Sequence, residues 1–452
     1  MSNNIDLKRG LTIPLSGAAA LKTSGTIVPQ TVAIKPTDFK GFAPRLLVRE
    51  GDKVLAGSPV LADKQNPDLL VSSPVSGEIQ AIVRGDKRKL LAVLVKADEK
   101  VQYQDFGIHN PGGMKAEEVK ELLLKAGLFP ALVQRPYGIV ADPSLTPKAI
   151  FISTFSTAPL AADTEYTLSE DFAAFQACVD ALGKLTPGGV HVGISKATAS
   201  SSPFHKVERA IIHEVSGKHP AGNVGVQISH ISPIMKGDTV WTLSPVLAVA
   251  IGRLLLTGKV DLRRKIAVTG PMAIDPAYVD ALPGIPVKSL RKFYDPTANE
   301  LRFVSGDALS GESIGEDGYL GYFSDQITIL REGRERELLG WINPIRPKQF
   351  SSSRAYFSWL TPKKTYPIDT NTHGGVRAFV CSNVYGDVLP MDIFPVYLIK
   401  ACLAGNIDDM EKYGIYEVLP EDLATCEFVD PSKNDIQDII AKGIDTMIKE
   451  MS

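Results

Sequence analysis

The fold of the N-terminal part is decided by Gly51-Asp52-Lys53-Val54-Leu55-Ala56-Gly57-Ser58-Pro59-Val60-Leu61 and, after it, by Ser73-Pro74-Val75-Ser76-Gly77-Glu78-Ile79. The glycines of these stretches can adopt the positive φ that a tight turn requires, and the flanking Val and Leu side chains supply a hydrophobic core. Apolar runs bounded by turn residues continue on both sides of these stretches. They predict short β-strands at Lys53–Ala62, Leu69–Ser72, Gly77–Val83 and Lys89–Val95.

The order of these patterns, G-D-x-V and then P-x-x-G, resembles the hairpins of biotinyl/lipoyl-type barrel-sandwich domains. A carrier domain of that type presents a modified lysine on an exposed hairpin, and Lys64 lies between the two glycine stretches. The turn continues through Gln65-Asn66-Pro67 and is longer than a tight carrier hairpin. A lipoyl- or biotinyl-type carrier protein is therefore one hypothesis, and a solvated loop lysine is the other.

From about residue 114 the pattern changes to alternating helices and strands. Helical spacing of apolar residues predicts helices at Lys115–Lys125 and Asp171–Leu182, and short apolar runs predict strands at Ala149–Ser153 and Gly189–Ile194. Such an alternation is typical of a Rossmann-like α/β sheet. Neither G-x-G-x-x-G nor G-x-x-x-x-G-K-[ST] occurs, so the pattern gives no indication of a nucleotide site.

The rest of the chain divides into a strand-rich part and a helical part. Strands are predicted at Lys265–Thr269, Gly284–Leu290, Leu301–Ser305 and Gln326–Leu330, and helices at Pro395–Ala404 and Asp435–Glu450. We therefore expect an α/β multidomain protein. Its parts are a barrel-sandwich domain with an N-terminal extension (1–100), a Rossmann-like α/β domain (101–257), a small β-grasp-like domain of SLBB type (258–340) and a mainly helical C-terminal region (341–452).

Composition excludes several classes of protein. The 452 residues carry 49 Lys plus Arg against 51 Asp plus Glu, and this balance argues against a nucleic-acid binder. The N-terminus has no apolar signal region, and the apolar run Pro245–Thr257 is interrupted by Arg253. We expect a soluble protein whose membrane attachment comes only through partners.

Cysteines and histidines do not indicate a metal centre. The four cysteines show no C-x-x-C spacing. Five of the seven histidines fall between His191 and His230, but their spacing matches no metal motif, so scattered structural histidines are favoured over a metal site. We expect no metal and no catalytic residue in this chain.

An ordered set of segments resembles the A subunits of the sodium-translocating NADH:quinone reductases (Na+-NQR), a family related to the C subunits of the Rnf complexes. The segments are Lys8–Leu11, the barrel-sandwich stretches, Pro159–Asp163, His219–Gly222, Leu330–Arg334, Leu338–Trp341, Val388–Asp392 and Glu421–Ala424. The resemblance implies a peripheral protein on the cytoplasmic face of the bacterial inner membrane. Its partners would be the other subunits, the membrane subunits above all, in a complex that couples NADH oxidation and quinone reduction to sodium export.

The resemblance also implies relatives that bind flavin through a glycine-rich loop and an iron–sulfur cluster through closely spaced cysteines. At the corresponding place this chain reads Leu128-Phe129-Pro130-Ala131-Leu132-Val133, whose side chains would keep a phosphate away from the backbone. Cys426 stands alone in its segment, which favours a buried apolar residue. We expect no bound cofactor here, with NADH, flavins and iron–sulfur on other subunits; an active flavin-dependent, Rnf-type NADH oxidoreductase is the alternative.

The resemblance finally implies a part in quinone binding. A quinone site needs an apolar slot and donors for the carbonyl oxygens. Phe129, Arg135 and Tyr137 offer an aromatic wall and donors and are the candidate quinone-binding residues. A packed loop without a ligand is the other interpretation of the same segment.

Overall fold

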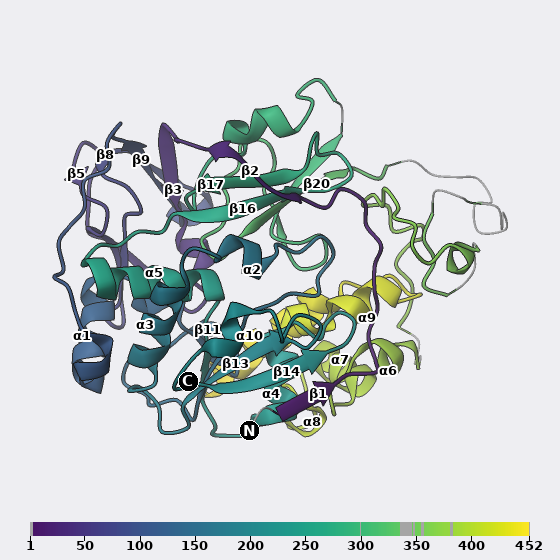
Figure 1. Cartoon of the computed structure of the whole chain (residues 1–452). Coiled ribbons are helices and arrows are strands. Elements are labelled where there is room, and N and C mark those ends of the chain that lie inside the picture. The colour runs from purple at the N-terminus through teal and green to yellow at the C-terminus, as the bar shows by residue number, and fades with distance from the viewer. Residues whose placement is uncertain are drawn as a thin grey trace.

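The computed structural model describes residues 3–298, 300–334, 346, 349–353, 357–379 and 383–451. Two small sheets form the N-terminal domain and confirm the predicted barrel-sandwich (Figure 1). In spatial order their strands are β3 (Thr31–Ile34), β9 (Leu90–Ala97), β8 (Gly77–Arg84) and β5 (Lys53–Val54), and then β4 (Pro44–Leu46), β6 (Pro59–Asp63) and β7 (Leu70–Ser72). Gly77 is required where β8 passes β9, because a Cβ there would collide with the carbonyl oxygen of Lys96.

A seven-stranded sheet forms the second domain and confirms the Rossmann-like α/β prediction. Its order is β1 (Asn3–Asp6), β14 (Ile211–Ser216), β13 (Val190–Ser195), β12 (Ile150–Ser153), β15 (Val240–Thr242), β10 (Val133–Arg135) and β11 (Ile139–Val140). The first five strands are parallel, and β10 and β11 are antiparallel to their neighbours. The N-terminal extension thus supplies an edge strand to a domain that lies far from it in sequence.

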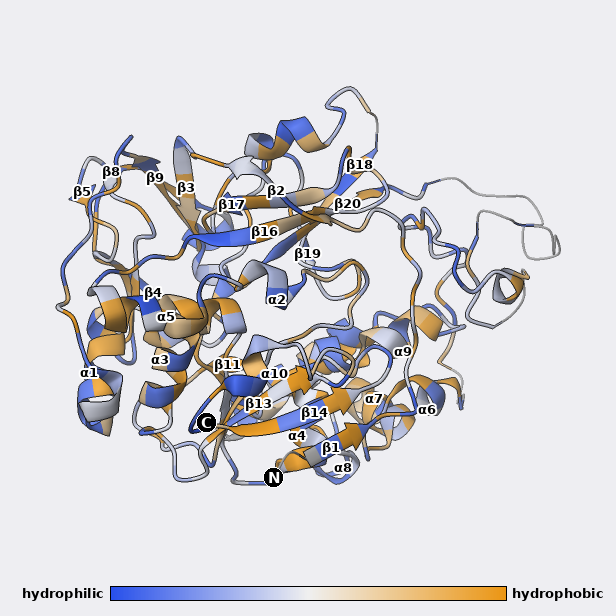
Figure 2. Ribbon diagram, in the orientation of Figure 1, coloured by the Kyte–Doolittle hydropathy of each residue, from blue (hydrophilic) through white to orange (hydrophobic). Residues whose placement is uncertain are grey.

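Helices cover both faces of this sheet. One face packs against α1 (Ala116–Lys125), α3 (Phe172–Leu182) and α5 (Pro245–Thr257). The other face packs against α4 (Val224–Ile231) and the C-terminal helices. The interrupted apolar run of the sequence is therefore the buried helix α5, and Figure 2 shows the hydrophobic colouring of the helices and strands at this core.

A six-stranded mixed sheet follows, in the order β19 (Glu312–Ser313), β18 (Leu301–Ser305), β20 (Gln326–Arg331), β16 (Arg264–Thr269), β17 (Ala277–Ala281) and β2 (Ala20–Thr26). The last strand comes from the N-terminal extension and runs parallel to β17. The prediction of a strand at Gly284–Leu290 is wrong, because a 3₁₀ helix spans Val287–Phe293. Gly284 has a φ of +78°, and Pro286 lacks the N–H that a strand ladder needs.

The C-terminal region is helical, as predicted, and forms a second hydrophobic core. Its helices are α6 (Val384–Val388), α7 (Pro395–Ala404), α8 (Ile407–Tyr413), α9 (Ala424–Val429) and α10 (Ile436–Met451). On α10, Ile436, Ile440, Ile444 and Met447 are fully buried along one face. The segment Leu338–Trp341 lies outside the described residues. No helix within the described residues is long and apolar enough to cross a membrane.

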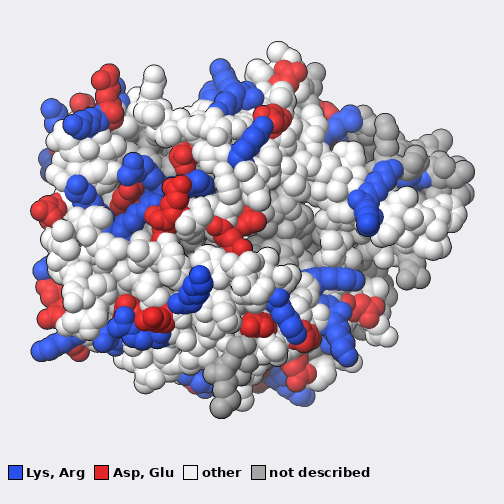
Figure 3. All heavy atoms as spheres, in the orientation of Figure 1, with Lys and Arg blue, Asp and Glu red and all other residues white. Residues whose placement is uncertain are grey.

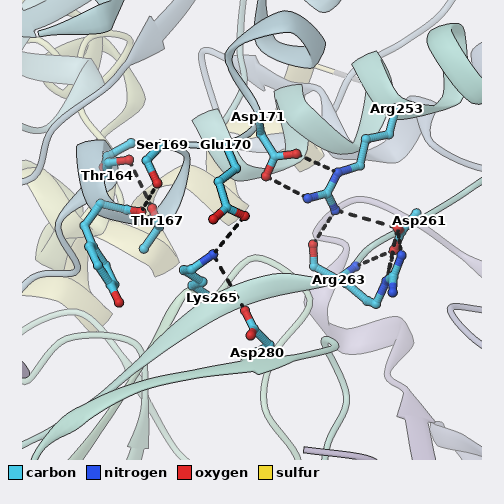
Figure 4. A network of polar contacts seen from close by, with 11 residues as sticks. Thr164, Thr167, Ser169, Glu170, Asp171, Arg253, Asp261, Arg263, Lys265 and Asp280 are labelled. Atoms are coloured by element: carbon cyan, nitrogen blue, oxygen red, sulfur yellow. Dashed lines mark hydrogen bonds and ion pairs between the residues drawn. The ribbon is translucent and has the colours of Figure 1, made fainter. Parts of the chain in front are cut away.

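Charged side chains join the α/β domain to the six-stranded sheet (Figure 4). Arg253 of α5 forms a two-point ion pair with Asp171, with Nε–Oδ1 at 3.1 Å and Nη2–Oδ2 at 2.7 Å. Its Nη1 donates to the carbonyl oxygen of Arg263, just before β16. Lys265 of β16 reaches Glu170, which precedes α3, at 3.9 Å. The residue that interrupts the apolar run of α5 thus tethers the two domains.

Candidate functional site

The three candidate quinone-binding residues lie on or beside β10, but the strand separates them. Arg135 pairs with Val240 and Gln134 pairs with Trp241, so Arg135 and Trp241 point to opposite faces of the sheet. Phe129, in the 3₁₀ turn before β10, is fully buried with its ring edge against Trp241, 5.5 Å between centroids. The structure therefore places Phe129 in the first core and Arg135 against the C-terminal region.

Arg135 belongs to a polar group that we call the Arg135 cluster, made of Arg135, Asn223, Glu421 and Asp422. The guanidinium donates from Nη1 to Oδ2 of Asp422 at 2.9 Å and from Nη2 to Oε1 of Glu421 at 3.0 Å. Asn223 donates from Nδ2 to the carbonyl oxygen of Glu421 and to Oδ1 of Asp422. The cluster joins β10, the start of α4 and the segment before α9.

Burial makes the Arg135–Asp422 pair the centre of this cluster. The side chains of Arg135 and Asp422 are 2% and 0% exposed, whereas that of Glu421 is 40% exposed. Gly225 of α4 leaves the space for them, because a Cβ there would collide with both groups of the pair. Asp422 also accepts from the backbone N–H of Leu419 at 3.0 Å. Removal of either charge alone would leave the other buried without its main partner.

Tyr137 lies beside the cluster, half-buried between β10 and the C-terminal region. Its ring meets Tyr416 edge to face at 6.2 Å, and the Tyr416 hydroxyl donates to Glu411. Burial raises the pKa of Tyr137, so its phenol stays protonated at neutral pH and can donate a hydrogen bond. The structure thus brings Arg135 and Tyr137 to one side of the sheet and leaves Phe129 on the other.

The crevice at the carboxyl ends of the parallel strands is where ligands bind in open α/β sheets, at the point where strand order reverses. Here that point lies between β12 and β15. Ser153, at the end of β12, donates to the carbonyl oxygen of Gly222 and accepts from Gln227 Nε2, both at 2.9 Å. Gly222 N–H donates to the Thr157 hydroxyl at 2.9 Å. The chain's own groups therefore occupy the crevice and satisfy one another.

The segment that stands in place of a glycine-rich loop is equally filled. Leu128, Phe129, Ala131 and Leu132 are each at most 1% exposed. A flavin phosphate needs backbone N–H groups that side chains leave open. The residues present here do not fit that requirement.

The His219–Gly222 turn carries contacts that the sequence did not reveal. His219 Nδ1 lies 3.2 Å from the Thr157 hydroxyl, and Asn223, next in the chain, joins the Arg135 cluster. Two of the segments that support the family resemblance, His219–Gly222 and Glu421–Ala424, are thus brought together. No local sequence pattern points to this contact, since its partners lie 199 positions apart.

Comparison with known proteins agrees with this architecture. The model of the NqrA N-terminal barrel-sandwich hybrid domain matches residues 5–98, and that of the NqrA second alpha/beta domain matches residues 114–260. The NqrA protein of the Na(+)-translocating NADH-quinone reductase of Serratia proteamaculans (strain 568) is 36% identical over 448 residues, covering 97% of this chain and 99% of that protein. This chain belongs to the NqrA family.

Two other NqrA proteins show the same extent of similarity. That of Yersinia pestis bv. Antiqua (strain Angola) is 35% identical over 437 residues, covering 95% of this chain and 96% of that protein. That of Pasteurella multocida (strain Pm70) is 34% identical over 454 residues, covering 99% of this chain and all of that protein. The family relation therefore extends over the barrel-sandwich, the α/β domain, the mixed sheet and the helical region alike.

The three cysteines of this NqrA-family chain that the structure describes are free thiols. Cys178 and Cys426 are fully buried and Cys402 is half-buried, while Cys381 lies outside the described residues. The prediction that Cys426 is a buried apolar residue is confirmed, and burial raises the pKa of its thiol. Across the part of the chain that the structure describes, no three His, Cys, Asp or Glu residues converge in a way that could hold a metal ion.

Two histidines of adjacent strands form a pair on the face of the sheet that carries α4. His191 Nδ1 lies 2.8 Å from His213 Nε2, and the His191 ring stacks on Phe151 with centroids 4.6 Å apart. Burial and the neighbouring His191 lower the pKa of His213 to about 4. His213 is therefore neutral at physiological pH and serves in the packing of the sheet.

Lys64 lies in the connection from β6 to β7 and is exposed. Asp63 organises this loop, because its carboxylate accepts from the backbone N–H groups of Ala43, Gln65 and Asn66. The loop is thus a longer, side-chain-stabilised turn, in keeping with the solvated-lysine interpretation.

Proposed function

We propose that this chain is the peripheral NqrA component of a sodium-translocating NADH:quinone reductase and works on the cytoplasmic face of the bacterial inner membrane. It docks there on the membrane subunits of the complex. The observation that carries this proposal is the nearly complete mutual coverage with NqrA of Serratia proteamaculans, 97% of one chain and 99% of the other. A chain that matches only a shared domain would not align from end to end.

The same proposal assigns no flavin or iron–sulfur centre to this chain and leaves NADH oxidation to other subunits. Three features support it: the filled crevice after β12, the packed segment from Leu128 to Leu132, and the burial of Cys178 and Cys426. The alternative of an Rnf-type flavin oxidoreductase has no such support, and the loop at Lys64 does not favour the carrier alternative.

Phe129, Arg135 and Tyr137 contribute to quinone binding in three different ways. Tyr137 is half-buried and protonated, so its phenol donates to a quinone carbonyl oxygen. Arg135 is a positioning residue, since both of its carboxylate partners hold the C-terminal region against the end of β10. Phe129 supports the strand from the opposite face through Trp241.

Affinity purification of the tagged chain from detergent-solubilised membranes of its host tests the assignment. We expect the eluate to contain membrane subunits and to reduce quinone with NADH at a rate that sodium increases. The chain purified alone should show no visible flavin absorption. Isolation without partners, from membranes whose complex stays intact, would contradict the assignment to the complex; a stoichiometric flavin spectrum would contradict the cofactor assignment only.

The Tyr137→Phe variant tests the quinone part of the proposal. Loss of one neutral hydrogen bond, worth about 0.5–1.5 kcal/mol, should raise the KM for quinone by a factor of about 2 to 13 in the purified complex and leave the KM for NADH unchanged. The matched control is Tyr397→Phe, because Tyr397 is 56% exposed on α7 and should change neither value. An unchanged quinone KM in Tyr137→Phe would remove Tyr137 from the site.

A further inference from the structure

Residues 357–364 form a short turn whose apolar side chains point outward. Phe357, Trp359 and Leu360 are 50%, 51% and 61% exposed, whereas the polar Ser358 between them is buried. The turn contains a 3₁₀ helix at Ser358–Leu360 and projects at the right-hand end of the molecule in Figure 1. This order, polar inside and apolar outside, is the reverse of that in a solvated turn.

Hydrogen bonds on the inner side hold the turn in this inverted arrangement. The Ser358 hydroxyl donates to the carbonyl oxygen of Ser351 and accepts from the backbone N–H of the same residue. The Thr361 hydroxyl lies 3.1 Å from that of Tyr366, whose backbone is bonded to Pro14 and Ser16 near the N-terminus. The exposed side chains are therefore presented by an anchored segment.

The surrounding sequence is basic. No Asp or Glu occurs between positions 338 and 368, although the whole chain has a net charge of -2. Of the five basic residues in this interval, the structure describes Arg346, Lys363 and Lys364. Arg346 is buried, so Lys363 and Lys364 are the described basic residues of the interval that face solvent. Lys363 and Lys364 are exposed directly after the apolar trio, and the Lys364 ammonium lies over the Tyr366 ring, 5.2 Å from its centroid. The projection at the right of Figure 3 carries blue side chains.

We propose that the 357–364 turn is a membrane-contact site that binds anionic phospholipid. Trp, Phe and Leu side chains enter the boundary between headgroups and acyl chains, where an aromatic ring gains apolar contact without losing water entirely. Lysines that follow them meet the negative headgroups, and their long aliphatic stems let the ammonium groups stay at that level. The site concerns lipid, so it extends beyond the proposed docking on membrane subunits.

Vesicle sedimentation with the full chain tests this site. We expect at least tenfold tighter binding to phosphatidylcholine vesicles with ~25% phosphatidylglycerol than to phosphatidylcholine alone, and a loss of that preference at high salt. Phe357→Ser/Trp359→Ser/Leu360→Ser should weaken binding to the anionic vesicles about tenfold. Lys363→Gln/Lys364→Gln should abolish most of the preference for anionic lipid.

Two matched variants serve as controls. Phe394→Ser/Tyr397→Ser/Leu403→Ser removes three apolar side chains of similar exposure (60%, 56% and 58%) at α7, and Lys87→Gln/Lys89→Gln removes two exposed lysines of the N-terminal domain. Both should bind vesicles like the parent chain. Quenching of tryptophan fluorescence by brominated lipid measures insertion of the turn into the bilayer, and we expect less quenching in Trp359→Phe. Phenylalanine keeps an aromatic ring at this position, so the variant changes the turn little.

Other outcomes would overturn the proposal. These are failure of the parent chain to bind anionic vesicles, equal weakening in the α7 control, or quenching that Trp359→Phe leaves unchanged. If the turn variants bind vesicles normally but no longer co-purify with membrane subunits, the turn is a protein contact and the lipid proposal is wrong. The assignment to the complex survives a negative vesicle result, because co-purification measures it separately.

Discussion

Replacement of Asp422 by alanine is expected to lower the free energy of unfolding by about 3–5 kcal/mol, the usual cost of leaving one member of a buried ion pair without its partner. Arg135 would keep its charge in a site where its side chain is 2% exposed. The N–H of Leu419 and one bond of Asn223 would lose their acceptor as well. Urea unfolding followed by circular dichroism measures the difference.

Glu421→Ala provides the control for this prediction. The Glu421 carboxylate lies 3.0 Å from the same guanidinium, but its side chain is 40% exposed. Water can therefore hydrogen-bond to the guanidinium when the carboxylate is removed. We expect a loss of no more than about 1 kcal/mol. The apolar double variant Arg135→Met/Asp422→Leu should recover part of the stability lost in Asp422→Ala, because it removes both charges together. Equal stabilities of Asp422→Ala and the parent chain would show that the pair is not buried as described.

Replacement of Gly252 by alanine is expected to destabilise the α/β domain by about 3 kcal/mol, at the upper end of the range for overpacked cores. Gly252 lies in the middle of α5 where this helix crosses α3, and a Cβ there would overlap the carbonyl group of Ala174. A backbone group cannot rotate away as a side chain can, so the two helices would have to separate. Thermal unfolding of the purified chain should show the effect as a lower Tm.

Gly386→Ala is the matched control, a second helical glycine that has no neighbouring atom where a Cβ would stand. Alanine should be neutral there or stabilise α6 by up to about 1 kcal/mol, because it reduces the freedom of the unfolded chain. A Tm of Gly252→Ala as high as that of Gly386→Ala would contradict the close approach of α3 and α5.

Much of the secondary structure could be predicted because its signals are local. The helix predicted at Pro395–Ala404 coincides with α7, and the strands around the two glycine stretches appear as β5 to β9. Each of these elements is set by apolar spacing and turn residues within a few positions. The prediction of a strand at Gly284–Leu290 was wrong because it followed the apolar residues of this segment. Pro286 lacks the N–H that a strand ladder needs, and this signal was not used.

The candidate site could be predicted only in part. Arg135 and Tyr137 were identified as donors from the sequence, and the structure places them on one side of the sheet. Phe129 was expected beside them, but it packs on Trp241 of β15. Trp241 pairs with Gln134 and therefore lies on the face of the sheet opposite to Arg135. The partners of Arg135 lie 286 and 287 positions away, and no local pattern points across that distance.

By itself, the sequence determined the family, the strands around the two glycine stretches and helices such as Pro395–Ala404, because these depend on residue type and short-range spacing. Only the tertiary structure decided that β1 joins the α/β sheet, that β2 joins the sheet of β16 and β17, and that Arg135 meets Asp422. Such contacts form because unpaired strand edges and buried charges require partners, and the folded chain supplies those partners from whichever segment packs beside them.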